Sequence, residues 1–241
     1  MTEAIELARA RPARHLLVVC ALLSSAARFV PVPFLDDILR ERIRQYLVSR
    51  LLRGSGRSFG SARVGALWKD AGGCASGCLA LAWKIPLKLI LFPIRKIIAI
   101  VSAVQGFARD VTESLLFGRA LDRALARGLL PEGASDAELA SQSVLVKSAF
   151  DRAVQGADTA LVGGALAEAL RGVKGLPKAA LRTARSLVRS EAPADPEAAA
   201  SAEDRQVVEQ GAGAVEAALE RADVARALAD FDARFDAGLG A

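Results

Sequence analysis

The sequence predicts an all-α protein, a multi-helix bundle whose N-terminal half holds hydrophobic, Pro-kinked amphipathic helices. Of its 241 residues, 52% are apolar but only 5% are aromatic, and the commonest types, led by Ala, Leu and Arg, favour helices. Glycine and proline fall mostly between segments in which apolar residues recur every three or four positions, the helical period. The mean hydropathy of +0.29 is high for a soluble chain, because Leu, Ile and Val cluster before residue 105.

Charge is divided unevenly along the chain. Residues 1–130 hold 20 Lys and Arg against 9 Asp and Glu, a net charge of +11, whereas residues 131–241 hold 12 against 18, a net charge of −6. Basic charge therefore accompanies the apolar half, which indicates an anionic surface, lipid or nucleic acid, as its partner. Alternatively, the two halves complement each other within one fold.

The first predicted helix combines a basic lead with the apolar run Leu16–Leu23 and small residues after it. This order imitates a secretory signal peptide, but two glutamates lie in the lead and the apolar phase continues to Val30. We therefore expect a helix that ends at Pro31 and Pro33, since proline clashes with the preceding turn and lacks an amide hydrogen. Secretion through an N-terminal signal is the alternative.

A second amphipathic helix follows the two prolines. Asp36 stands at the predicted N-cap, with Asp37 in the first turn, where carboxylates complement the helix dipole. Apolar residues from Leu39 to Leu51 recur along one face, and arginines occupy much of the remainder. The stretch GSGRSFG, residues 54–60, ends this helix and predicts a flexible basic linker.

Residues 21–53 thus combine an apolar helix, a PVP corner, an acidic residue and a second amphipathic helix. This order resembles an arrangement in helical membrane-associated domains of the EcsC and YcjF types. The chain departs from that arrangement at Phe34 and Leu35, where small residues are expected. The resemblance implies association with a membrane and no particular activity.

The stretch WKIPLKLILFPIRKIIAI, residues 83–100, is apolar but carries four cations and two prolines. A bilayer-spanning helix needs about 20 predominantly apolar residues, and cations near the bilayer centre are costly, so a simple span is not expected. Two short helices, or one bent helix, would instead lie at the headgroup boundary, with cations reaching phosphate and apolar side chains entering the acyl region. A core helix with cations at its rim is the alternative. The expected contacts are Trp83, Lys84, Lys88, Arg95 and Lys96.

Two conventional amphipathic helices are predicted next. The stretch 107–128 gives the first, with Gly128 and Pro131 as stops. Ser135 and Glu138 have the spacing of a capping box, in which each side chain satisfies the other residue's free backbone amide. They predict the start of a second helix that extends to Val154.

A second basic stripe follows the helical period, with spacings of 3, 4, 4, 3 and 4 residues. Gly175 and Pro177 indicate that the regular helix starts there. A basic stripe is often only a solvated face; otherwise it binds anionic lipid, nucleic acid or an acidic partner. The stripe consists of Arg171, Lys174, Lys178, Arg182, Arg185 and Arg189.

The end of the chain is acidic. A Pro/Ala/acidic linker, residues 191–203, leads to an acidic C-terminal helix and tail, residues 204–241. That helix would offer the basic stripe an intramolecular partner, and its last stretch, DARFDAGLGA, is expected to fray. The preceding chain divides into a basic apolar helical region, 1–130, and an amphipathic helical region of the same bundle, 131–190.

No catalytic constellation is recognised. The chain has one histidine, His15, no phosphate-binding glycine loop and no Ser-His-Asp set. Cys74 and Cys78 would share a helix face, but tetrahedral zinc needs four ligands, so both are interpreted as packing residues. We expect no cofactor, no metal and no small-molecule substrate, and interpret the protein as a non-enzyme. The remaining enzymatic alternative is a carboxylate site, which would need a cleft and raised pKa values at Asp36, Asp37 or Asp110.

These features predict a bacterial, non-enzymatic helical protein, peripheral or re-entrant at the cytoplasmic face of a membrane, that acts as a scaffold or interaction partner. Its expected partners are an anionic membrane surface and either another protein or a second copy of itself. The alternative is a soluble helical bundle that binds nucleic acid or an acidic protein through its basic stripes. Scarce aromatics and the lack of a helix-turn-helix pattern rank nucleic acid below lipid.

Overall fold

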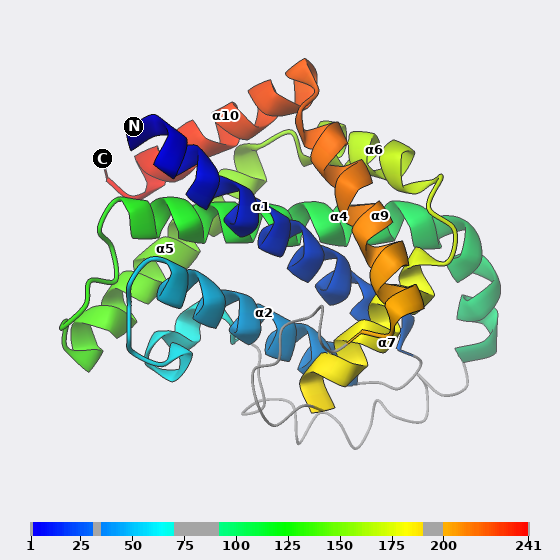
Figure 1. Cartoon of the computed structure of the whole chain (residues 1–241), viewed down its shortest axis with the longest axis horizontal. Coiled ribbons are helices and arrows are strands. Elements are labelled where there is room, and N and C mark those ends of the chain that lie inside the picture. The colour runs from blue at the N-terminus through cyan, green and yellow to red at the C-terminus, as the bar shows by residue number, and fades with distance from the viewer. Residues whose placement is uncertain (1, 31–34, 70–91, 190–199, 241) are drawn as a thin grey trace.

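A computed structural model describes residues 2–30, 35–69, 92–189 and 200–240, with side chains described except in 2–13 and 92–105. In this part of the chain the secondary structure is helical, without strands, and the all-α prediction is confirmed. The helices are α1 (Thr2–Ala26), the 3-10 helix η1 (Ala27–Phe29), α2 (Leu35–Gly54), the 3-10 helix η2 (Ser61–Leu67), α4 (Phe92–Ala126), α5 (Asp136–Gly156), α6 (Thr159–Leu170), α7 (Leu176–Arg189), α9 (Ala202–Leu219) and α10 (Ala222–Gly238) (Figure 1).

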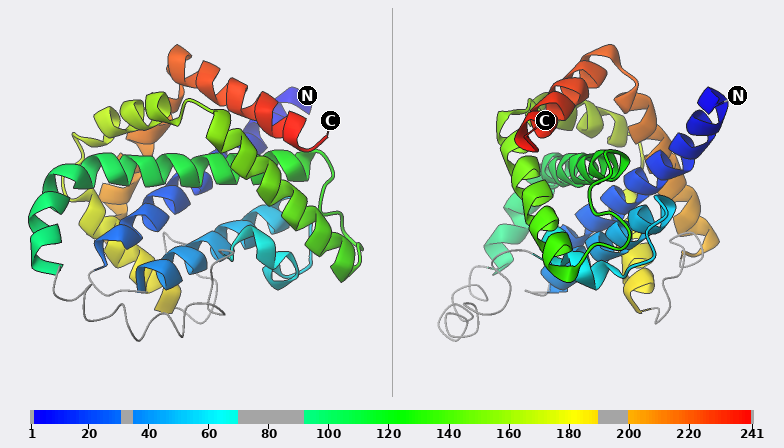
Figure 2. Two further views of the ribbon diagram at one scale, coloured as in Figure 1. Left: turned by 180° about the vertical axis from the view of Figure 1, so that it is seen from behind. Right: turned by 90° about the vertical axis from the view of Figure 1, so that its left-hand side faces the viewer.

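The longest helix, α4, forms the centre of the bundle. Its 35 residues cross the molecule, and the right-hand view of Figure 2 looks along part of it, with the other helices arranged around it. Val111, Leu116 and Leu121 point in different directions from its axis and are at most 2% exposed. Because a helix that is apolar on several sides must be covered on several sides, α4 packs against α1, α2, α5 and α6.

The apolar run that imitates a signal peptide lies in the core. Val18, Leu22 and Leu23 are fully buried, and α1 packs against α4, α2, α7 and α9. Gly118 of α4 permits the close crossing of α1 and α4, because a Cβ at this position would lie 2.5 Å from a methyl group of Leu17. Helices from the middle and the end of the sequence therefore cover α1 together.

The start of α2 and the stretch after it differ from the prediction. α2 begins at Leu35, so Asp36 lies inside the first turn beside Asp37 and not at the N-cap. The stretch 54–60 is not a free linker, because Arg57 donates hydrogen bonds to the carbonyls of Leu125 and Leu129, at 2.9 and 3.2 Å. Leu125 lies in the last turn of α4, where carbonyls lack intrahelical partners, and Leu129 lies shortly after the helix ends.

The prediction of separate helices before and after residue 105 is wrong. Phe92–Ala126 is one helix, and Pro93 lies in its first turn, where a missing amide hydrogen costs no hydrogen bond. The stop at Gly128 is confirmed by its φ of +81°. The capping box of Ser135 and Glu138 is confirmed as well, at the start of α5.

The C-terminal region forms two helices, α9 and α10, where one was expected. α10 extends to Gly238 through most of the stretch that was expected to fray. Phe231 and Phe235 explain why it does not, since they are at most 1% exposed and Phe231 meets the ring of Phe150 on α5, edge to face.

Arginines on one face of α4 hold α10 in place. Arg119 donates to both carboxylate oxygens of Asp232, at 2.8 and 2.7 Å. Arg123 donates to both oxygens of Asp236, and Arg127 lies 2.6 Å from the same carboxylate. The hydrogen bonds from Arg123, above all, lower the pKa of Asp236. Such bidentate pairs fix the direction of approach as well as the charge.

We expect Asp236→Ala to lower the free energy of unfolding by about 2 kcal/mol, because it removes charged hydrogen bonds at a largely buried acceptor. The lowered pKa means that this contribution is full above the unfolded pKa of Asp, about 3.9, and is lost as pH falls through the folded value. Urea unfolding would measure it. Asp230→Ala is the matched control, since the ion pair of Asp230 with a described residue is the exposed one with Arg234; equal losses would contradict the expectation.

Candidate anionic-surface site

One face of α7 is apolar and buried. Leu176, Ala180 and Leu187 are at most 6% exposed, and the helix packs against α1, α2 and α9. Gly211 of α9 allows that helix to approach closely, because a Cβ there would lie 2.7 Å from a methyl group of Leu176. α7 is therefore held in a fixed orientation, which decides where its cations point.

The opposite face of α7 is cationic. At 100° per residue its four cations fall within an arc of about 60°, and the structure shows all four side chains exposed. They are Lys178, Arg182, Arg185 and Arg189.

The first two cations of the stripe lie before this helix. The backbone amide of Arg171 donates to the carbonyl of Glu168 at 3.3 Å and closes α6, and Lys174 lies in the turn that follows. Gly175 has a φ of +80°, a conformation that suits glycine and ends the helical phase between Lys174 and Lys178. The spacing of six cations therefore does not correspond to one helix, although the helix starts where Gly175 predicts.

The other predicted contacts cannot be related to α7. Trp83, Lys84 and Lys88 lie outside the described residues, and Arg95 and Lys96 belong to the first turns of α4, where side chains are not described. Their contact with a membrane stays a prediction.

Arg182 is engaged within the chain. Its Nε lies 2.9 and 3.1 Å from the two carboxylate oxygens of Asp204 on α9, and Nη2 donates to the same group. Asp204 is 5% exposed, and the hydrogen bonds from Arg182 are the main reason why the pKa of Asp204 lies below its usual value. The acidic C-terminal region thus meets the stripe, at this cation.

Lys178, Arg185 and Arg189 differ from Arg182. None of them forms an ion pair with a side chain in the part of the chain that the structure describes. Leu181 and Val188 lie beside this row, half-buried and packed against the core. A cationic row that borders partly exposed aliphatic side chains is typical of helices that lie at a lipid headgroup layer.

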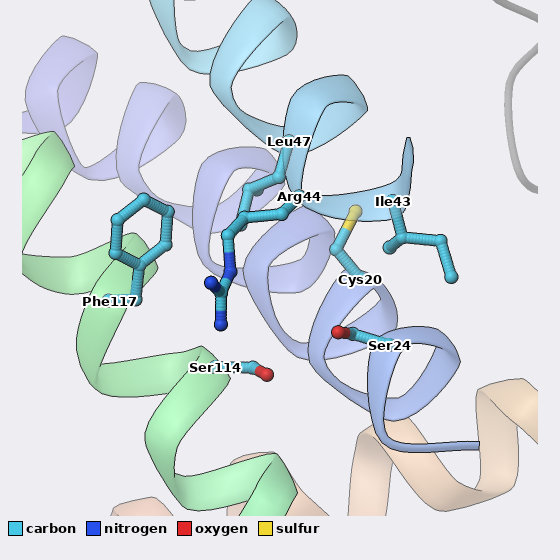
Figure 3. Close-up of a pocket in the computed structure, with 7 residues that line it drawn as sticks. All are labelled: Cys20, Ser24, Ile43, Arg44, Leu47, Ser114 and Phe117. Atoms are coloured by element: carbon cyan, nitrogen blue, oxygen red, sulfur yellow. The ribbon is translucent and has the colours of Figure 1, made fainter. Parts of the chain in front are cut away.

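A small cavity lies between α1, α2 and α4 (Figure 3). Its volume of about 10 Å³ holds at most one water molecule, so it has no room for a substrate. The guanidinium of Arg44 lies 5.4 Å from the centre of the Phe117 ring, a distance that suits cation–π packing. The lining residues are Cys20, Ser24, Ile43, Arg44, Leu47, Ser114 and Phe117.

The described residues offer neither a metal site nor a membrane-spanning helix. No group of three His, Cys, Asp or Glu side chains among them is placed to hold a metal ion. None of their helices has the length and apolarity that a crossing of the bilayer requires. Cys20 is buried in the core, whereas Cys74 and Cys78 lie outside the described residues.

Comparison with known proteins adds no relative. No family model matches the chain, and searches of curated proteins and of solved structures found no match. The resemblance of residues 21–53 to EcsC- and YcjF-type domains stays a prediction.

We expect Asp204→Ala to loosen α9, because it removes the bidentate partner of Arg182 from a buried position, a loss of about 1–3 kcal/mol. Hydrogen exchange of the α9 backbone amides would rise while that of α5 stays unchanged. Since the pKa of Asp204 is lowered in the folded protein, the stabilisation that Asp204 gives to α9 is lost as pH falls through the folded pKa. The control is Glu203→Ala, at the exposed neighbouring position in the same helical turn, which should leave hydrogen exchange of α9 unchanged. An equal rise in exchange in this control would mean that the ion pair of Asp204 with Arg182 does not hold α9.

Proposed function

We propose that this protein is a non-enzymatic peripheral membrane protein that binds an anionic lipid surface through α7 and acts there as a scaffold or interaction partner. The observation that carries the proposal is the row of Lys178, Arg185 and Arg189. These side chains are exposed on a helix whose other face is anchored in the core, and they make no ion pair with a described residue.

The charge of this row matches an anionic leaflet in sign and in size. Each Lys or Arg near such a surface contributes about 1 kcal/mol, so three contribute about 3 kcal/mol, roughly a 100-fold gain in binding. The cytoplasmic leaflet carries the anionic lipids, which agrees with the predicted location.

Charge alone would suit nucleic acid equally well. The neighbours of the row favour lipid, because the half-buried Leu181 and Val188 gain burial when they enter a headgroup layer and gain little against a phosphate backbone. The predicted headgroup segment, residues 83–100, supports the same choice, since its apolar residues would add insertion to electrostatic attraction.

We expect Lys178→Gln/Arg185→Gln/Arg189→Gln to lower binding to anionic vesicles by about 100-fold, because three attractive charges are lost. Flotation of the full chain with vesicles of anionic and of neutral phospholipid would measure it. Neutral vesicles should bind the wild type and the variant equally.

The matched control removes the same charge elsewhere. Arg53, Arg109 and Arg226 are exposed and lie on three different helices, so their joint replacement by Gln should lower binding only slightly. An equal loss of binding in this control would mean that binding depends on the net charge of the protein and not on the cationic row of α7. Failure of the wild type to float, together with salt-dependent binding to DNA, would favour the nucleic-acid alternative.

A second prediction concerns the predicted headgroup segment, residues 83–100. We expect Ile90→Asp/Ile97→Asp to abolish the binding that survives high salt, because salt screens the cationic row but not apolar insertion. Flotation at low and high salt separates the two contributions. Salt-resistant binding that persists in this variant would exclude insertion of the segment.

A further inference from the structure

The single histidine of the chain lies between two carboxylates of another helix. His15 on α1 has its Nδ1 2.9 Å from Glu216 Oε1, and its Nε2 lies 3.3 Å from the carboxylate of Glu209. Both glutamates belong to α9 and are seven residues apart, which places them two turns apart along one side of that helix. The histidine side chain is 33% exposed, so it lies at the edge of the contact between α1 and α9.

Neutral histidine cannot satisfy this arrangement. A neutral imidazole has one N–H donor and one nitrogen lone pair, whereas an ionised carboxylate only accepts. One ring nitrogen would therefore direct its lone pair at a carboxylate oxygen. Imidazolium donates from both nitrogens and fits both glutamates.

We propose that His15 is a pH-sensitive latch between α1 and α9: imidazolium bridges Glu209 and Glu216, and loss of its proton releases one of them. The latch goes beyond the membrane function and does not depend on it. Its consequence is that α9 is held more firmly at mildly acidic than at alkaline pH.

Among the described side chains, the charged groups that contact the latch lie on the same two helices. Arg14 precedes the histidine on α1, but it is directed to other acceptors, the backbone carbonyl of Glu216 at 3.0 Å and the carboxylate of Glu220 at 3.5 Å. α2, α4 and α7 also pack on α1, and none of their described side chains forms an ion pair with His15.

Burial alone would lower the pKa of His15, but the hydrogen bond to Glu216 and the charges of both carboxylates outweigh burial and raise the pKa. A raised folded pKa gives a stabilising contribution that is full below the unfolded value, about 6.5, and is lost as pH rises through the folded value. The raised pKa agrees with the hydrogen-bond geometry, because only imidazolium has an N–H donor for each of the two carboxylates.

The first test is an NMR titration of the imidazole, whose signals need no assignment because the chain has one histidine. We expect a midpoint above about 6.5 in the wild type, and a midpoint at or below that value in Glu209→Gln/Glu216→Gln, where burial acts without the two carboxylates. A wild-type midpoint at or below 6.5 would overturn the latch, and the wild-type titration alone decides this if the double variant fails to fold.

The second test is hydrogen exchange of α9 at about pH 5.5 and pH 8.5, corrected for intrinsic rates. The wild type should lose protection at the higher pH, by about tenfold for each unit of raised pKa, whereas His15→Gln should show no such loss. Arg14→Gln is the control, since it removes a non-titrating contact and should weaken α9 equally at both pH values. The same pH dependence in wild type and His15→Gln would refute the proposal, whatever the vesicle experiments show.

Discussion

From Phe107 to Leu125, α4 presents buried apolar side chains on several sides, and such a helix is stable only where neighbours cover each of them. α1, α2, α5 and α6 meet this requirement directly, and α10 is attached through the arginines at the C-terminal end of α4. α7 and α9 then cover the side of α1 that α4 leaves open. Because α4 packs on α1 and α1 packs on α7, the burial of the central helix also sets the orientation of the cationic row on α7.

Local rules predict the parts of this fold that depend on neighbours in sequence. The apolar periods of α2 and α5, the capping box of Ser135 and the glycine stop after α4 need only a few residues to be recognised. The continuity of α4 through Phe92–Ala126 was missed because the stretches before and after residue 105 were interpreted separately. Pro93 lies in the first turn of this helix, which agrees with the expectation that a proline here could open a helix. α6 was missed as well, although Asp158 caps it through the amide of Leu161 at 2.9 Å.

The candidate site could be predicted only in part, because the role of a cation depends on partners far away in sequence. Arg57 binds carbonyls 68 and 72 residues away, Arg119 a carboxylate 113 residues away and Arg182 one 22 residues away. Helical spacing places Arg182 and Arg185 on the same face without indicating that the first is paired with Asp204. The excess of basic residues in the first half therefore overstates its free positive charge, since several of those arginines hold the bundle together.

The burial of α1 beneath α7 and α9 also fixes when the protein can complete its core during synthesis. Val18 and Leu22 lie on α1, but α7 and α9, which complete the cover of this helix, begin more than 150 residues later in the chain. During that interval α2 and α4 can cover only part of α1, so the growing polypeptide presents the remaining apolar side, and exposed apolar surface of this kind is prone to aggregate unless chaperones bind it. Final assembly of the bundle is therefore a late event in its biosynthesis, because α1 is fully buried only after α7 and α9 have been synthesised.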